Sequence, residues 1–126
     1  MRILTGVVSG LAGLELLLSG VSMVSVMTAA KTRFADLVGG LPPDPVLQGL
    51  GVVHLAAFAG VLAGGREPRA AVAAGLWLAT YAGFVLLRQV QGGQRGGQLF
   101  AYALFMVLGV ALVALRAPAA TALARL

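Results

Sequence analysis

The sequence predicts an all-α protein whose four helices cross a membrane as a bundle joined by short loops. Of its 126 residues, 60% are hydrophobic and only 10% are charged. Soluble domains carry about 25% charged residues, so this chain has too few charges to cover a soluble globule. It also contains four apolar segments, each at or above the roughly 17 residues that a helix needs to cross the hydrocarbon core. In lipid, only helices or closed β-barrels satisfy the hydrogen bonds of the backbone. These segments lack the alternation of apolar and polar residues that barrel strands have, so we expect helices.

The first predicted span covers residues 3–28. It is too long for the apolar core of a signal peptide, which has roughly 7–15 residues, so we expect a retained helix. The following connection ends in Leu41-Pro42-Pro43-Asp44-Pro45, where the prolines stop one helix and Pro45 can open the next. Phe34, Leu37 and Val38 favour a short interfacial helix before these prolines.

The other predicted spans cover residues 46–63, 70–87 and 98–115, so the whole chain, 1–126, forms one membrane domain. A tight turn, Gly64 to Arg69, joins the second span to the third. A Gly/Gln-rich loop, Gln89 to Gly97, precedes the fourth, and it is either a plain hairpin linker or a lid over a cavity.

Small residues recur at four-residue spacing on three of the predicted helices. Such rows let helix backbones approach closely, which compensates for the missing hydrophobic drive between helices in lipid. The rows predict a compact bundle that forms a homodimer through a glycine face or joins a larger membrane complex. They comprise Ala71, Gly75, Ala79 and Gly83; Ala56, Gly60 and Gly64; Gly6 and Gly10; and Ser9 and Gly13.

The formal net charge of +5 is spread over the segment ends. Without a basic block, this charge indicates contact with lipid headgroups and not with nucleic acid. The chain has no cysteine, which excludes disulfides, thiol catalysis and iron–sulfur clusters. We expect an integral protein of a bacterial inner membrane. Five basic residues on the side of the termini against four on the opposite side slightly favour cytoplasmic termini.

Glu15 is the strongest candidate functional residue, because it is the single acid of the first span. A carboxylate at the centre of a membrane helix costs roughly 2.5–3.5 kcal/mol, so intramembrane acids usually have a partner and a function. Ser19 and Ser22 follow at i+4 and i+7 and extend a polar face from Glu15. The alternative is a structural role, in which a protonated Glu15 bonds to a neighbouring helix.

His54 lies near the middle of the second span, at about the depth of Glu15. We therefore predict a cavity with Glu15 and His54 at its floor as candidate acid/base residues, although both also have structural interpretations. Aromatic and polar residues of the third and fourth spans lie between the depth of Glu15 and His54 and the membrane surface on the side of Lys31. The candidate ligand-binding residues are Ser19, Ser22, Trp77, Tyr81, Arg88, Gln98 and Tyr102.

The sequence predicts no metal site and no cofactor. A single histidine could bind haem iron, but a second axial ligand would have to come from another subunit. The sequence also lacks the H-x-x-x-H, Gly-x-Ser-x-Gly and phosphate-loop motifs, so it leaves open whether the protein is an enzyme.

The second and third spans resemble the DoxX-like group of small four-helix membrane proteins. The resemblance rests on the glycine-rich stretch 51–62, which begins Gly51-Val52-Val53-His54-Leu55, on Arg69-Ala70-Ala71, and on Ala79 and Gly83. It implies a four-helix bundle and association with quinone-dependent oxidoreductase complexes. The chain differs from the group in having His54 where an acid is expected and its acid on the first span.

These observations support three functional hypotheses. The first is binding of a lipophilic small molecule, such as a quinone, an isoprenoid or a lipid, in an intramembrane cavity. The protein would then be a subunit associated with an oxidoreductase or a small acid/base enzyme. The second is a proton-coupled transporter of the small multidrug type that uses Glu15. The third is a structural membrane subunit without a site.

Overall fold

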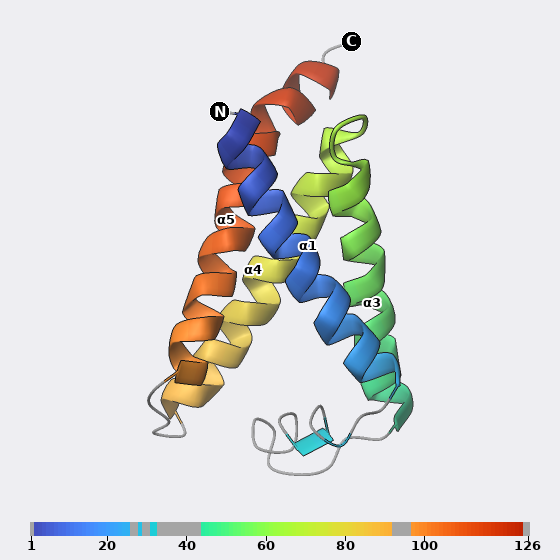
Figure 1. Ribbon diagram of the computed structural model, residues 1–126, viewed down its shortest axis with the longest axis vertical. Coiled ribbons are helices and arrows are strands. Elements are labelled where there is room, and N and C mark those ends of the chain that lie inside the picture. Colours follow the sequence, from blue (N-terminus) through green and yellow to red (C-terminus); the bar gives the residue numbers. More distant parts are fainter. Residues whose placement is uncertain (1, 26–27, 29–30, 33–43, 92–96, 125–126) are drawn as a thin grey trace.

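The computed structural model describes residues 2–25, 28, 31–32, 44–91 and 97–124 (Figure 1). Four long helices account for nearly all of this part, and it contains no strand, which confirms the predicted all-α class. Each helix is long and apolar enough to cross a membrane. The helices are α1 (Arg2–Val24), α3 (Asp44–Ala63), α4 (Pro68–Gln91) and α5 (Gly97–Ala124).

Local sequence explains where the first two helices end and begin. α1 ends at Val24, four residues before the end of the predicted span, and its last carbonyl accepts a hydrogen bond from Gln48 Nε2 at 3.3 Å. Asp44 lies in the first turn of α3, where a carboxylate faces the positive end of the helix dipole. It pairs with Lys31 at 3.5 Å. The predicted interfacial helix around Phe34 lies outside the described residues.

The predicted turn between α3 and α4 is present and tight. The amides of Arg66 and Glu67 both donate to the carbonyl of Ala63, at 3.0 and 2.8 Å. Pro68 then opens α4, at the position where a missing amide hydrogen costs nothing. The Glu67 carboxylate accepts hydrogen bonds from the Arg69 guanidinium, and this contact lowers the pKa of Glu67 below its ordinary value.

The last two helices are longer than the predicted spans. α4 continues to Gln91, so Gln89 and its neighbours belong to a helix and not to the predicted loop. The rest of that loop lies outside the described residues. α5 continues past Leu115 to Ala124 and contains Pro118, whose ring removes one helical hydrogen bond. Figure 1 shows the last turns of α5 leaning away from the rest of the helix.

The helices form two pairs, α1 with α3 and α4 with α5. Figure 1 shows the pairs close together at the end that carries both termini and the α3/α4 turn, and further apart at the opposite end. Both termini therefore lie at one end, as four spans require. Lys31 and Arg88 belong to the opposite end of the bundle.

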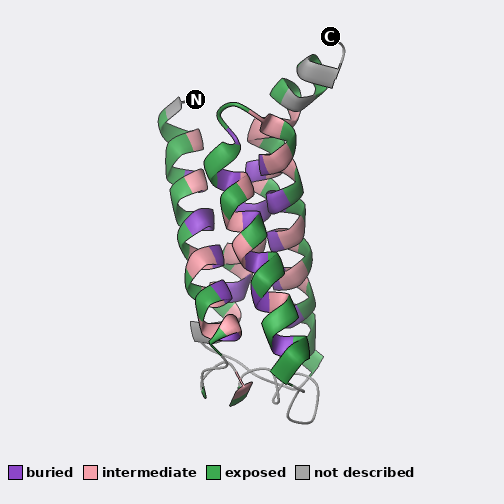
Figure 2. Cartoon of the chain, turned by 90° about the vertical axis from the view of Figure 1, so that its right-hand side faces the viewer, coloured by how far each residue is buried: buried purple, intermediate pink, exposed green. Residues whose placement is uncertain are grey.

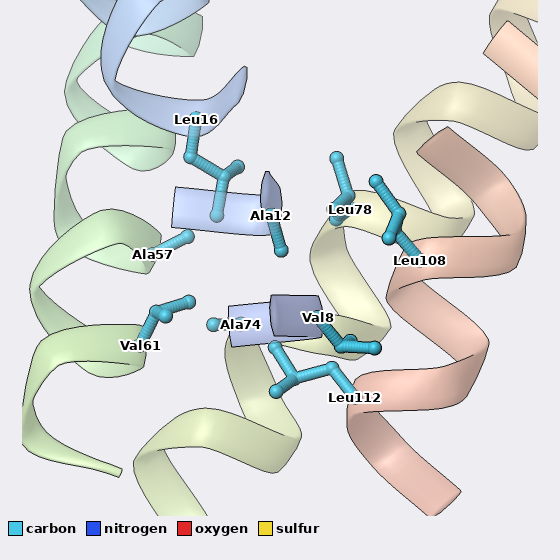
Figure 3. Close-up of a cluster of buried hydrophobic side chains, with 9 residues drawn as sticks. All are labelled: Val8, Ala12, Leu16, Ala57, Val61, Ala74, Leu78, Leu108 and Leu112. Atoms are coloured by element: carbon cyan, nitrogen blue, oxygen red, sulfur yellow. The ribbon is translucent and has the colours of Figure 1, made fainter. Parts of the chain in front are cut away.

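All four helices contribute to one apolar core, which Figure 3 shows. Leu16 and Leu112 are fully buried there, and Leu78 is nearly so. The outer faces are also apolar: Figure 2 shows exposed residues along the outside of every helix, and they include Leu62 and Phe100. Large apolar side chains on both faces fit a helix bundle surrounded by lipid. The core comprises Val8, Ala12, Leu16, Ala57, Val61, Ala74, Leu78, Leu108 and Leu112.

Reciprocal glycine contacts hold each pair together. A Cβ on Gly109 of α5 would lie 2.5 Å from the Ala79 nitrogen, and a Cβ on Gly75 of α4 would lie 2.8 Å from the Gly109 carbonyl oxygen. Gly20 and Gly51 meet in the same way between α1 and α3. At Gly51, Gly75 and Gly109 a larger side chain would collide with backbone atoms of the neighbouring helix.

The predicted rows of small residues therefore have different roles. The row on α4 faces α5, as the close contacts of Gly75 and Ala79 show. On α3, Gly60 and Gly64 pack against Ala70 and Ala71 of α4. A Cβ on Gly6 or Gly10 of α1 would meet nothing within 4 Å, so this row lies on the open surface of the bundle.

Candidate functional site

The polar face predicted on α1 is a connected chain of hydrogen bonds. Ser19 Oγ donates to Glu15 Oε1 at 2.5 Å, and Ser22 Oγ donates to the Ser19 carbonyl at 3.0 Å. Glu15 is partly buried on the side of α1 that also carries Val8 and Ala12, which belong to the core. Glu15 lies at the edge of this buried face, because Leu11 and Leu18, one turn before and after it, are exposed. A hydroxyl from its own helix, that of Ser19, is one partner of its carboxyl.

His54 is completely buried on the inner face of α3. It shares that face with Leu47 and Val61, which precede and follow it by seven residues and are also buried. Trp77 and Tyr81 of α4 lie against its ring. The ring centroids of His54 and Tyr81 are 4.5 Å apart, those of His54 and Trp77 are 5.5 Å apart, and both pairs are edge-to-face. The structure thus brings together three of the residues that the sequence predicts for the site.

The two nitrogens of His54 have different surroundings. Nδ1 lies 2.9 Å from the Leu50 carbonyl oxygen and 3.3 Å from Nε1 of Trp77. The carbonyl requires a proton on Nδ1, whereas the indole N–H requires a lone pair there, so one tautomer cannot satisfy both contacts. Nε2 is buried and has no hydrogen-bond partner among the described residues.

Two other predicted site residues, Tyr102 and Arg88, lie outside the group of rings around His54. Tyr102 is buried in the α4/α5 interface with Ala82 and Val85, and its ring packs edge-to-face on Phe105 at 5.6 Å. Arg88 is exposed, and its Nη1 donates to Gln91 Oε1 at 3.3 Å. The side chain of Gln98 lies outside the described residues.

Tyr81 connects the two groups of aromatic residues. It contacts the His54 ring on one side and packs against the cluster that contains Tyr102 on the other. Glu15 lies on α1 and His54 on α3, the two helices of the first pair. The cavity predicted between them stays a prediction.

Gln89 is a buried polar residue that the sequence reasoning missed. Its side chain is almost fully buried, and Oε1 has no hydrogen-bond partner within the described ranges. The signal was present in the spacing: Gln89 follows Ala82 and Val85 by seven and four residues, which places all three on one face of α4. Treating residue 89 as part of a loop concealed it.

The described residues offer no group of three or more His, Asp and Glu side chains for a metal ion. Comparisons with family models, with curated protein sequences and with solved structures gave no match. Function is therefore inferred from the geometry of this chain.

Proposed function

We propose that this integral membrane protein binds a lipophilic small molecule whose polar head group bonds to His54. Its closest surroundings would be Trp77 and Tyr81, with the Glu15 and Ser19 pair on the facing helix. The resemblance to the DoxX-like group makes quinones the first class to test.

One observation carries the proposal: Nε2 of a fully buried histidine has no partner among the described residues. A buried polar group without a hydrogen bond costs about 1–3 kcal/mol. The contacts of Nδ1 with Leu50 and Trp77 give the imidazole a structural role, but they leave the cost at Nε2 uncompensated. A head-group oxygen within hydrogen-bond distance of Nε2 would remove the cost.

The two contacts of Nδ1 allow Nε2 of His54 to act either as an acceptor or as a donor towards a ligand. When Nδ1 carries the proton and donates to Leu50, Nε2 is an acceptor for a ligand hydroxyl. When Nε2 carries the proton, it donates to a ligand carbonyl, and Nδ1 accepts from Trp77. Each tautomer has a partner for Nδ1, so the site suits a lipophile that presents a carbonyl or a hydroxyl.

Two measurements test this proposal. Mass spectrometry of an organic extract of the purified protein should reveal a bound lipophile with such a head group. Thermal unfolding with a short-chain benzoquinone, and separately with its quinol, should show stabilisation that saturates. At about 100 times the Kd, a ligand adds about 2.7 kcal/mol of stability.

A matched pair of variants separates binding from folding. His54→Phe keeps an aromatic ring beside Tyr81 but removes both nitrogens, so the unliganded protein should fold and the ligand effect should vanish. Val52→Phe places the same new side chain on the exposed face of α3 and should keep the ligand effect. An empty extract together with equal responses of wild type and His54→Phe to both probes would refute the proposal.

A further inference from the structure

A second feature of the molecule lies on its outer surface, between α3 and α4. Here the two helices leave an open apolar groove of about 330 Å³. It is lined by five alanines, Gly60, Val53 and Trp77. Since small side chains form the walls, the groove is a gap in the packing of two membrane helices and not a space between long side chains.

The groove has a definite position in the membrane. It runs along α4 from Ala70 to Trp77, seven residues and so about 10 Å along the helix axis. Both helices that form it are long and apolar enough to cross the bilayer. The groove therefore begins close to the α3/α4 turn, at the headgroup level, and ends near mid-membrane, surrounded by acyl chains.

Positive charge lies at the outer end of the groove. Arg69, Ala73 and Trp77 follow one another at four-residue spacing, so Arg69 begins the same helix face that lines the groove. Arg66 is exposed in the preceding turn. The bond between Arg69 Nε and Glu67 Oε1, at 2.7 Å, balances one positive charge and leaves the turn with a net charge of +1.

We propose that the groove holds one acyl chain of an anionic phospholipid, whose phosphate group contacts the arginines of the turn. A single apolar chain suits a narrow groove with alanine walls, and the charged turn selects the headgroup. This lipid site shares Trp77 with the proposed lipophile site, since the Trp77 side chain lines the groove and its N–H donates to His54. Ala56 and Arg66, which the tests below change, are not part of the lipophile site.

The test uses the whole protein in nanodiscs of phosphatidylglycerol and phosphatidylcholine with matched acyl chains, followed by native mass spectrometry. Wild type should retain phosphatidylglycerol in preference to phosphatidylcholine. Arg66→Gln should reduce this preference about fivefold, the ratio that corresponds to about 1 kcal/mol for one basic side chain at a membrane surface. Arg66→Lys should keep most of it.

The groove is tested separately from the charge. Ala56→Leu fills the groove, whereas Ala59→Leu makes the same change on an exposed part of α3 outside it. Only the first should lose bound lipid, while both should keep the elution volume and the helix content of wild type. Equal retention of lipid by both variants, or equal retention of both lipid classes by wild type, overturns the proposal. So does a wild-type dimer that Ala56→Leu converts to a monomer, because a second copy of the chain would then fill the groove.

Discussion

Replacement of Gly109 by alanine tests how the α4/α5 pair is held together. A methyl group at this position would lie 2.5 Å from the Ala79 nitrogen and 2.7 Å from the Gly75 carbonyl oxygen. The shorter distance is about 0.9 Å below the 3.4 Å at which ordinary contact begins. Both neighbours are backbone atoms of a helix, so a rotamer change cannot relieve the clash and the helices must separate.

The cost can be worked out from this clash. Overpacking of a well-filled interior costs about 1–3 kcal/mol. A gain in helix propensity of up to about 1 kcal/mol partly offsets it. Because both neighbours are backbone atoms, the clash takes the upper end of this range, so we expect a net loss of about 2 kcal/mol. This loss lowers the equilibrium constant for folding roughly 30-fold. Reversible unfolding in mixed micelles, with increasing mole fraction of dodecyl sulfate, measures this change through the loss of helical signal.

Gly10→Ala provides the matched control, because its new methyl group meets nothing within 4 Å. This variant should be as stable as wild type or slightly more stable. If Gly109→Ala were as stable as Gly10→Ala, the close approach of α4 and α5 would not be a source of stability. The packing reasoning would then be refuted.

Three further outcomes follow from individual contacts. Ser19→Ala removes the hydrogen bond to Glu15 and should lower the free energy of unfolding by about 1 kcal/mol in the same micelle titration; an unchanged value would show that the bond contributes nothing. Trp77→Phe removes the indole donor from Nδ1 of His54, so the tautomer protonated at Nδ1 should increase. Because the chain has one histidine, ¹⁵N NMR reads this ratio directly, and identical spectra of wild type and variant would contradict the assignment. The pKa of Glu67 is lowered in the folded state, so its contribution to stability is present above the ordinary pKa of 4.5 and is lost as the pH falls through the lowered value. Wild type should therefore lose more stability than Glu67→Gln below pH 4.5, and parallel pH curves for the two proteins would argue against this ion pair.

Composition and segment length were sufficient to predict the four helices, because a membrane helix must be long, apolar and internally hydrogen-bonded. The α3/α4 turn was also predictable, since glycine and proline mark it directly. Rotation of each helix about its axis was harder to predict. In a soluble helix the polar face identifies the outside, but here both faces are apolar. The row containing Gly6 and Gly10 therefore looked equivalent to the row containing Gly75, although one faces outwards and the other faces α5.

The same ambiguity affected the candidate site. Spacing along α4 predicted that Trp77 and Tyr81 share one face, and both rings lie against His54, which the sequence placed at about the depth of Glu15. Tyr102 follows Gln98 by four residues, the same spacing as that between Trp77 and Tyr81. It nevertheless packs within the α4/α5 interface, because α5 is rotated so that this position faces α4. The contact with the Leu50 carbonyl was not predictable from residue types, since it depends on a rotamer and a backbone atom.

The glycine contacts within each pair have a consequence for biosynthesis. Among the four described long helices, α1 and α3 are consecutive, as are α4 and α5, so each pair can close as soon as its second helix enters the membrane. Since chains fold from the N-terminus during synthesis, we expect the first pair to form before the second leaves the ribosome. Assembly then joins two finished pairs, and the inner face of α3, which carries His54, remains uncovered until α4 arrives.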